Sequence, residues 1–197
     1  FRVHLRSLYL NDNKKHYSVL KEENIINNAI VIDSVSKRYS MCGARIGCIT
    51  SRNKELIQTC LKFAQARLSP PTFGQLAGIE ALKAKDDYFD KVINEYEERR
   101  NLLVSELNKI EGVNCPNPKG AFYCIAELPI DDSNKFCKWI LEKYSLDNQT
   151  VMMAPASGFY TKLDSGKKQV RIAYVLNKDK ILKATKIIKE ALKQYKN

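Results

Sequence analysis

The most informative segment of this sequence is Ser34-Val35-Ser36-Lys37-Arg38-Tyr39-Ser40-Met41-Cys42-Gly43-Ala44-Arg45-Ile46-Gly47. It follows the apolar run Ala29–Asp33, which predicts a short buried strand. A lysine at the end of such a strand can project into the cleft where α/β folds bind ligands. A nearby arginine and two serine hydroxyls would form a cradle for a phosphate group. The pattern allows a nucleophilic lysine beside an anion site. By spacing alone, however, the better interpretation is a solvated loop lysine, with the arginine paired to a carboxylate.

The rest of the chain alternates short apolar runs with amphipathic segments. Strands are predicted over residues 45–50, 120–128, 150–154 and 170–175. Helices are predicted over residues 53–66, 73–84, 88–110, 133–144 and 178–195. This order predicts an α/β first half with buried strands and an α+β second lobe, joined by the long helix near residues 88–110.

The stretch at residues 34–47 resembles the cofactor-lysine motif of class I/II aminotransferases, the fold-type-I enzymes that use pyridoxal phosphate. Their pattern is S-x-S-K, an aromatic residue two positions later, and then G-x-R-x-G. Every position of that pattern is matched here, by Ser34, Ser36, Lys37, Tyr39, Gly43, Arg45 and Gly47. The resemblance is closest to the aspartate-aminotransferase-like members.

Later segments resemble the same family in the same order. Ser69-Pro70-Pro71 with Gln75 resembles the turn and helix after the lysine strand, and residues 118–123 resemble a P-x-G-A-F-Y hairpin. Residues 155–159 resemble a P-G-x-x-F loop, with Ala156 at the usual glycine, and residues 170–174 resemble a V-R-I-x-[YF] strand. The resemblance covers residues 25–197. It implies the C-terminal part of the large α/β cofactor domain over residues 1–90 and the small α+β domain over residues 91–197.

The resemblance also implies a role for each matched polar residue. Lys37 would hold pyridoxal 5'-phosphate as a Schiff base and, after the substrate amine releases it, carry the proton between the substrate Cα and the cofactor. Arg45 would bind the cofactor phosphate, with Ser34 or Ser36 helping. Arg171 would bind the substrate α-carboxylate through two N–H groups; without the resemblance it would be a surface charge on an edge strand.

By the same resemblance, the parent enzyme transfers an amino group between an amino acid, with aspartate as the first candidate, and a 2-oxo acid such as 2-oxoglutarate. We expect a homodimer, because family sites borrow residues across the dimer interface, and a cytoplasmic location. The family's phosphate loop, ring-stacking aromatic residue, asparagine and aspartate would all precede Phe1. The chain is therefore interpreted as a C-terminal fragment that binds the cofactor weakly and is inactive by itself.

Two other function classes stay open. A lyase or synthase of the same fold would use the same Lys37, Arg45 and Arg171. The net charge of +11 also allows a basic binding module with a vestigial site. Nucleic acid is not the expected partner, because the lysines are spread along segments such as residues 178–196 and no recognised binding motif is present. Arg67 could reach a substrate side chain, but a charge at a helix end is the better interpretation.

Cysteine, histidine and hydropathy patterns exclude other classes of site. The six cysteines have no C-x-x-C spacing and are predicted to be small core residues in a reducing compartment. His4 and His16 are isolated, so we expect no metal site. No apolar run reaches the roughly 18 residues that a membrane helix needs, so we expect no membrane partner.

Overall fold

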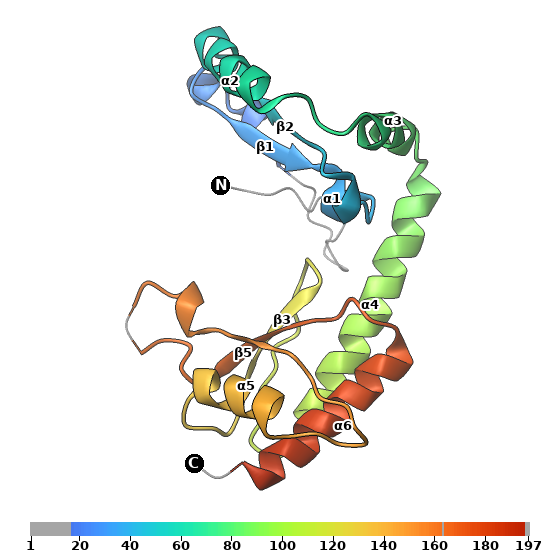
Figure 1. The fold of residues 1–197 in the computed structure, drawn as a ribbon, viewed down its shortest axis with the longest axis vertical. Coiled ribbons are helices and arrows are strands. Elements are labelled where there is room, and N and C mark those ends of the chain that lie inside the picture. Colours follow the sequence, from blue (N-terminus) through green and yellow to red (C-terminus); the bar gives the residue numbers. More distant parts are fainter. Residues whose placement is uncertain (1–16, 163, 196–197) are drawn as a thin grey trace. The chain divides into compact units, whose positions relative to one another are not determined.

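The computed structural model describes residues 17–162 and 164–195 and separates the chain into two compact units, residues 1–91 and 92–197 (Figure 1). The boundary between the units falls within the long helix α4 (Asp86–Asn108), which confirms the helix predicted over residues 88–110. The two histidines, at positions 4 and 16, lie outside the described residues.

The first unit contains an antiparallel two-stranded ribbon, β1 (Val31–Ser34) and β2 (Gly47–Thr50). Both strands were predicted, but the prediction that they are buried is wrong for the described chain. Ile30 beside β1 is 48% exposed, Ile32 within it is 40% exposed, and all four residues of β2 are exposed. The apolar run indicates a strand that packs against other apolar groups, and the described residues of this unit do not cover it.

Two short helices precede this ribbon, and helices follow each of its strands. Their bounds are η2 (Val19–Lys21), η3 (Glu23–Ile25), α1 (Val35–Arg38), η4 (Cys42–Ala44), α2 (Lys54–Arg67) and α3 (Thr72–Ala81). The predicted helices over residues 53–66 and 73–84 are confirmed as α2 and α3. Helix α2 begins where the Asn53 side chain accepts a hydrogen bond from the Leu56 amide at 3.0 Å. The single-turn helix α1 was not predicted, because its sequence is too short and too polar to show a helical period.

The second unit has a three-stranded antiparallel sheet in the order β3-β5-β4 (Figure 1). The strands are β3 (Tyr123–Glu127), β4 (Ala154–Pro155) and β5 (Gln169–Ala173), so β5 lies in the centre. The helices are η5 (Ser157–Phe159), α5 (Ser133–Glu142) and α6 (Lys178–Gln194), besides the C-terminal part of α4. The strand predicted over residues 150–154 is shorter than expected, since only its last residue pairs with β5.

One face of this sheet carries the core of the second unit. Alternate residues of β3 are buried, as the strand period of two requires, while in β5 Val170 is buried and Ile172 is partly exposed. Apolar side chains of the three helices are buried as well: Leu103 and Leu107 from α4, Phe136 and Ile140 from α5, and Ile187, Ile188 and Ala191 from α6. The other face of the sheet therefore presents its side chains outward.

Among the described residues, no helix is long and apolar enough to cross a membrane. All six cysteines are free. Cys115, Cys124 and Cys137 are buried in the second unit, as expected of small core residues, but Cys42 and Cys48 are exposed in the first. The core prediction is therefore wrong for those two.

Candidate active site

The serines before Lys37 set the backbone from which the lysine projects. Ser34 ends β1 and caps α1: its hydroxyl oxygen accepts a hydrogen bond from the Ser36 amide at 3.0 Å. The same hydroxyl donates to the Ser36 Oγ at 2.8 Å. Lys37 therefore lies in the first helical turn after the strand, and its side chain is exposed.

Cys42 links the lysine to the arginine of the motif. Lys37 Nζ donates to Cys42 Sγ at 3.8 Å, and Arg45 Nη1 donates to the Cys42 carbonyl oxygen at 2.9 Å. The Cys42 thiol in turn donates to the Ser36 carbonyl oxygen at 3.2 Å. The structure thus brings Ser34, Ser36, Lys37 and Arg45 into one cluster. Sequence reasoning missed the part played by Cys42, because a cysteine directly before the G-x-R-x-G pattern gives no signal of its own.

Close backbone approaches hold the loop that carries Arg45. Arg45 itself has a φ of 57°, in the left-handed region, which disfavours a residue with a side chain by about 1 kcal/mol. A Cβ at Gly47 would lie 2.8 Å from the Asp33 carbonyl oxygen, and a Cβ at Gly74 of α3 would lie 2.4 Å from the Ala44 carbonyl oxygen. Glycine at position 47 lets β2 approach β1, and glycine at position 74 lets α3 approach the loop.

The charges around this cluster favour an anion. The Asp33 carboxylate forms an ion pair with Arg38 at 2.6 Å and also accepts a hydrogen bond from the Ser34 amide at 2.7 Å. Arg45 forms no ion pair with a described residue, which argues against the alternative of an arginine paired to a carboxylate. The neighbouring acid is already neutralised, so the cluster carries excess positive charge.

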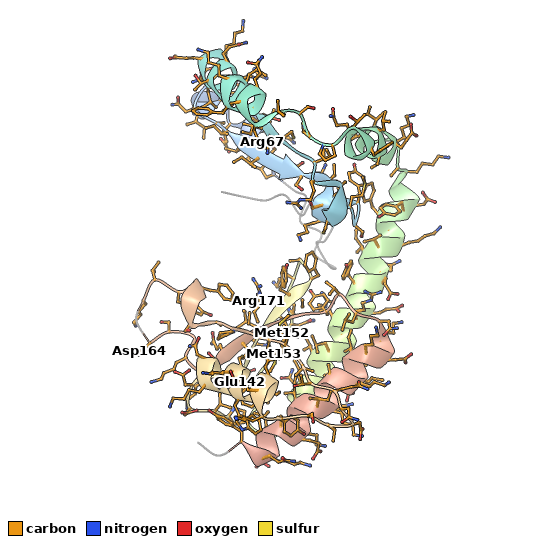
Figure 2. The ribbon with its side chains drawn as sticks, in the orientation of Figure 1. Arg67, Glu142, Met152, Met153, Asp164 and Arg171 are labelled. Carbon is orange, nitrogen blue, oxygen red and sulfur yellow. The ribbon has the colours of Figure 1, made fainter. Side chains whose placement is uncertain are left out.

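Arg171 lies in the middle of the central strand of the second unit (Figure 2). Its guanidinium carbon Cζ lies 4.7 Å from the ring centre of Tyr123 and 4.8 Å from that of Phe159. The Arg171 guanidinium forms no hydrogen bond or ion pair with a described residue. The sequence motifs contain both rings but give no indication that they lie against Arg171. The register of β3 on β5 supplies this contact. It pairs Tyr123 with Ala173, two residues beyond Arg171, so that Tyr123 and Arg171 are diagonal neighbours on the same face of the sheet.

The loop that carries Phe159 accepts an alanine at its second position. Ala156 has φ −91° and ψ −8°, in the right-handed helical region that any residue adopts, and its side chain is fully buried. The change from the family's usual glycine therefore does not strain this loop.

Among residues 17–162 and 164–195, no group of three or more His, Cys, Asp or Glu side chains is arranged to hold a metal ion. Arg67 is the last residue of α2 and is exposed (Figure 2). This agrees with the interpretation of a charge at a helix end.

Comparison with known families and structures gives this site a context. The model of the aminotransferase class I and II family matches residues 9–188. The chain belongs to this family. The aspartate aminotransferase of Pyrococcus horikoshii is 30% identical over 188 residues, which are 93% of this chain and 46% of that protein. The (5-formylfuran-3-yl)methyl phosphate transaminase of Methanocaldococcus jannaschii is 32% identical over 180 residues, 90% of this chain and 46% of that protein.

A solved aminotransferase shares the fold. The crystal structure of the aspartate aminotransferase from Rhizobium meliloti matches with a TM-score of 0.78 and 25% identity, over 94% of this chain and 47% of that one. The fold-type-I aminotransferase fold expected from the sequence is therefore confirmed. Members of the family are pyridoxal-phosphate-dependent transferases. The chain spans about half the length of the curated relatives that it matches.

Proposed function

We propose that this chain serves a pyridoxal-phosphate-dependent aminotransferase that moves an amino group between an amino acid and a 2-oxo acid. The observation that carries the proposal is that Lys37 and Arg45 both donate hydrogen bonds to Cys42, beside two serine hydroxyls. These residues lie in the part of the chain that the family model matches. Aspartate and 2-oxoglutarate are the first pair to test, because several relatives are aspartate aminotransferases. Other relatives carry other substrate names, so the family alone does not decide the amino acid.

The chemistry of the cluster fits the cofactor. Pyridoxal phosphate carries an aldehyde and a phosphate group. An amine can bind the aldehyde covalently, and a guanidinium and hydroxyl groups can donate hydrogen bonds to the phosphate oxygens. Lys37 provides the amine, Arg45 the guanidinium, and Ser34 and Ser36 the hydroxyls. The ion pair with Arg38 neutralises the Asp33 carboxylate, which would otherwise repel a phosphate. When bound, the cofactor supplies the electron sink for the bond broken at the substrate Cα.

The residues of the chain have separate tasks in this scheme. Lys37 would hold the cofactor, and its Nζ, once released by the substrate amine, would take the proton from the substrate Cα. Arg45, with Ser34 or Ser36, binds the phosphate and fixes the cofactor in place. Arg171 binds the substrate α-carboxylate, a role supported by the absence of any described acidic partner for its guanidinium.

The domain assignment is part of the proposal. Residues 1–90 would be the C-terminal part of the large cofactor-binding domain, and residues 91–197 the small domain. The division of the chain into units of residues 1–91 and 92–197 supports this assignment. A homodimeric, cytoplasmic enzyme remains the expectation drawn from the family resemblance.

The test is to trap the cofactor on its lysine. The chain is incubated with pyridoxal phosphate, reduced with borohydride, digested, and the modified peptide is identified by mass spectrometry, while absorbance is followed in parallel. We expect one dominant adduct, on Lys37, and none at that peptide in Lys37→Ala. Lys54→Ala is the matched control, because Lys54 is an exposed lysine of the same unit. Adducts spread evenly over surface lysines would overturn the assignment of Lys37.

A further inference from the structure

Arg171 is held by aromatic ring faces rather than by an acid. Its Cζ lies at nearly equal distances, 4.7 and 4.8 Å, from the ring centres of Tyr123 and Phe159. Tyr123 comes from β3, on one side of the central strand, and Phe159 comes from η5, which follows β4 on the other side. The guanidinium is therefore contacted from both flanks of β5. It forms no ion pair or hydrogen bond with a described residue.

Each of the two rings belongs to a segment that is held by contacts within the second unit. Tyr123 lies within β3, which is paired with β5 along its whole length, and its ring packs 4.4 Å from that of Phe122. Phe159 lies in the loop after β4 and is 53% exposed, so the burial of its ring does not explain its place.

Hydrogen bonds tie the loop of Phe159 to its surroundings. The Ala156 amide donates to the Gln169 carbonyl oxygen at 2.9 Å, and the Phe159 amide donates to the Ala156 carbonyl oxygen at 2.9 Å. The Asn134 side chain of α5 donates to the Ser157 hydroxyl at 3.0 Å. These hydrogen bonds connect the segment of Phe159 to β5 and α5, and the Phe159 ring contacts Arg171.

A guanidinium held in this way has a defined chemistry. Its two faces attract aromatic rings, while its N–H donors lie in its own plane and match a carboxylate with two parallel hydrogen bonds. Rings on the faces leave the in-plane donors available, whereas an acidic partner would occupy them. Fixing the plane in advance also reduces the side-chain entropy that an arginine loses when it binds.

We propose that Tyr123 and Phe159 are positioning residues that hold the Arg171 guanidinium by its faces and so present its N–H edge to a substrate carboxylate. This inference rests on the proposed function, in which Arg171 binds the α-carboxylate. All three residues belong to the second unit, which has its own core, so the arrangement does not depend on the first unit.

The test follows the Arg171 side chain by ¹⁵N NMR in the full 197-residue chain during titration with 2-oxoglutarate, with sodium chloride at equal ionic strength as the reference titration. The Arg171 Nε–H signal is assigned by its loss in Arg171→Lys. We expect a saturable shift in the wild-type chain. Tyr123→Leu and Phe159→Leu should each raise Kd about threefold, and the double variant about tenfold. Tyr123→Phe and Phe159→Tyr keep the ring faces and should restore binding.

The outcomes separate this inference from the proposed function. If the wild-type chain binds and Arg171→Lys does not, but the leucine variants bind as tightly as the wild type, the positioning role is wrong and the carboxylate role stands. If the wild-type chain shows no saturable shift, or Arg171→Lys responds equally, the carboxylate role is wrong and the positioning role is lost with it. The unfolding midpoint from Trp139 fluorescence checks that each variant is folded, and the half-exposed Phe159 is the safer of the two sites to change.

Discussion

The two units of this chain maintain their structure in different ways. The second unit buries apolar side chains from α4, α5, α6, β3 and β5, and Phe136 in α5 is 0% exposed. In the described part of the first unit, the buried residues are Ala29, Gly74 and Gly78, while Phe73 in α3 is 87% exposed. The second unit therefore has a hydrophobic core of its own, and the described residues of the first unit do not form one.

This difference bears directly on the proposed site. The lysine cluster is arranged by short local contacts, namely the serine cap, the Cys42 bridge and the close approaches at Gly47 and Gly74. Arg171 is instead arranged by a sheet packed on a core. Local hydrogen bonds at exposed positions open more easily than a packed sheet. We therefore expect the surroundings of Arg171 to be more rigid than the lysine cluster in this chain.

Removal of one phenylalanine ring from each unit gives the largest expected contrast. Phe136→Ala should lower the free energy of unfolding of the second unit by about 3–5 kcal/mol, because the ring leaves a cavity in a close-packed core. Phe73→Ala should change that free energy by less than about 0.5 kcal/mol, because its ring is solvated. The measurement is urea denaturation followed by fluorescence of Trp139, the single tryptophan, whose ring packs against Phe136.

Equal losses in the two variants would contradict the expected difference between the units, since they would mean that Phe73 is covered in solution. If Phe136→Ala proves too unstable to purify, Phe136→Leu tests the same cavity with a smaller loss. Sedimentation of the wild-type chain over a range of concentrations then shows whether self-association covers Phe73.

The helix caps offer a matched pair with a smaller effect. Asn53 begins α2 in the first unit and Asn177 begins α6 in the second, and each side chain accepts one hydrogen bond from a helix amide at 3.0 Å. Asn177→Ala should lower the free energy of unfolding seen by Trp139 by about 1 kcal/mol, because α6 forms part of the core. Asn53→Ala should leave that transition unchanged and reduce helical circular dichroism only slightly.

The contrast between the caps would fail if Asn53→Ala shifted the Trp139 transition as far as Asn177→Ala. That result would show that α2 unfolds together with the second unit, and the two units would then form one cooperative body. Aspartate at either position serves as the conservative control, since its carboxylate also accepts the capping hydrogen bond.

The sequence was sufficient to predict the elements that rest on local rules. Helices α2, α5 and α6 were predicted from apolar periodicity, and in the structure the side chains of Asn53, Asp132 and Asn177 accept amide hydrogen bonds where these helices begin. The motif also located the cluster of Ser34, Ser36, Lys37 and Arg45 correctly as one neighbourhood, because those residues lie within twelve positions of one another.

Features that depend on distant partners were not predictable. The apolar run of β1 indicates a buried strand, but a run of residues cannot show which groups will cover it. The rings around Arg171 come from positions 48 residues before and 12 residues before it, so only the strand register and the path of the η5 loop bring them together. The short helix α1 depends on a serine cap rather than on an apolar period.

The smallest expected effect is a pH dependence confined to the second unit. Hydrogen bonds from Lys135 and Tyr195 lower the pKa of Asp131 to about 2. The folded state thus has a lower pKa than the unfolded chain, at about 4. The stabilisation by the Asp131 carboxylate is then fully present above about pH 4 and is lost as the pH falls toward 2. The thermal midpoint of Asp131→Asn, measured by Trp139 fluorescence, should therefore fall less between pH 4 and pH 2 than that of the wild type.

Asp147→Asn is the control, because Asp147 is exposed and forms no ion pair with a described residue, so it should follow the wild-type curve. Parallel curves for wild type and Asp131→Asn would show that the contact joining α5 to the C-terminal end of α6 does not stabilise the second unit.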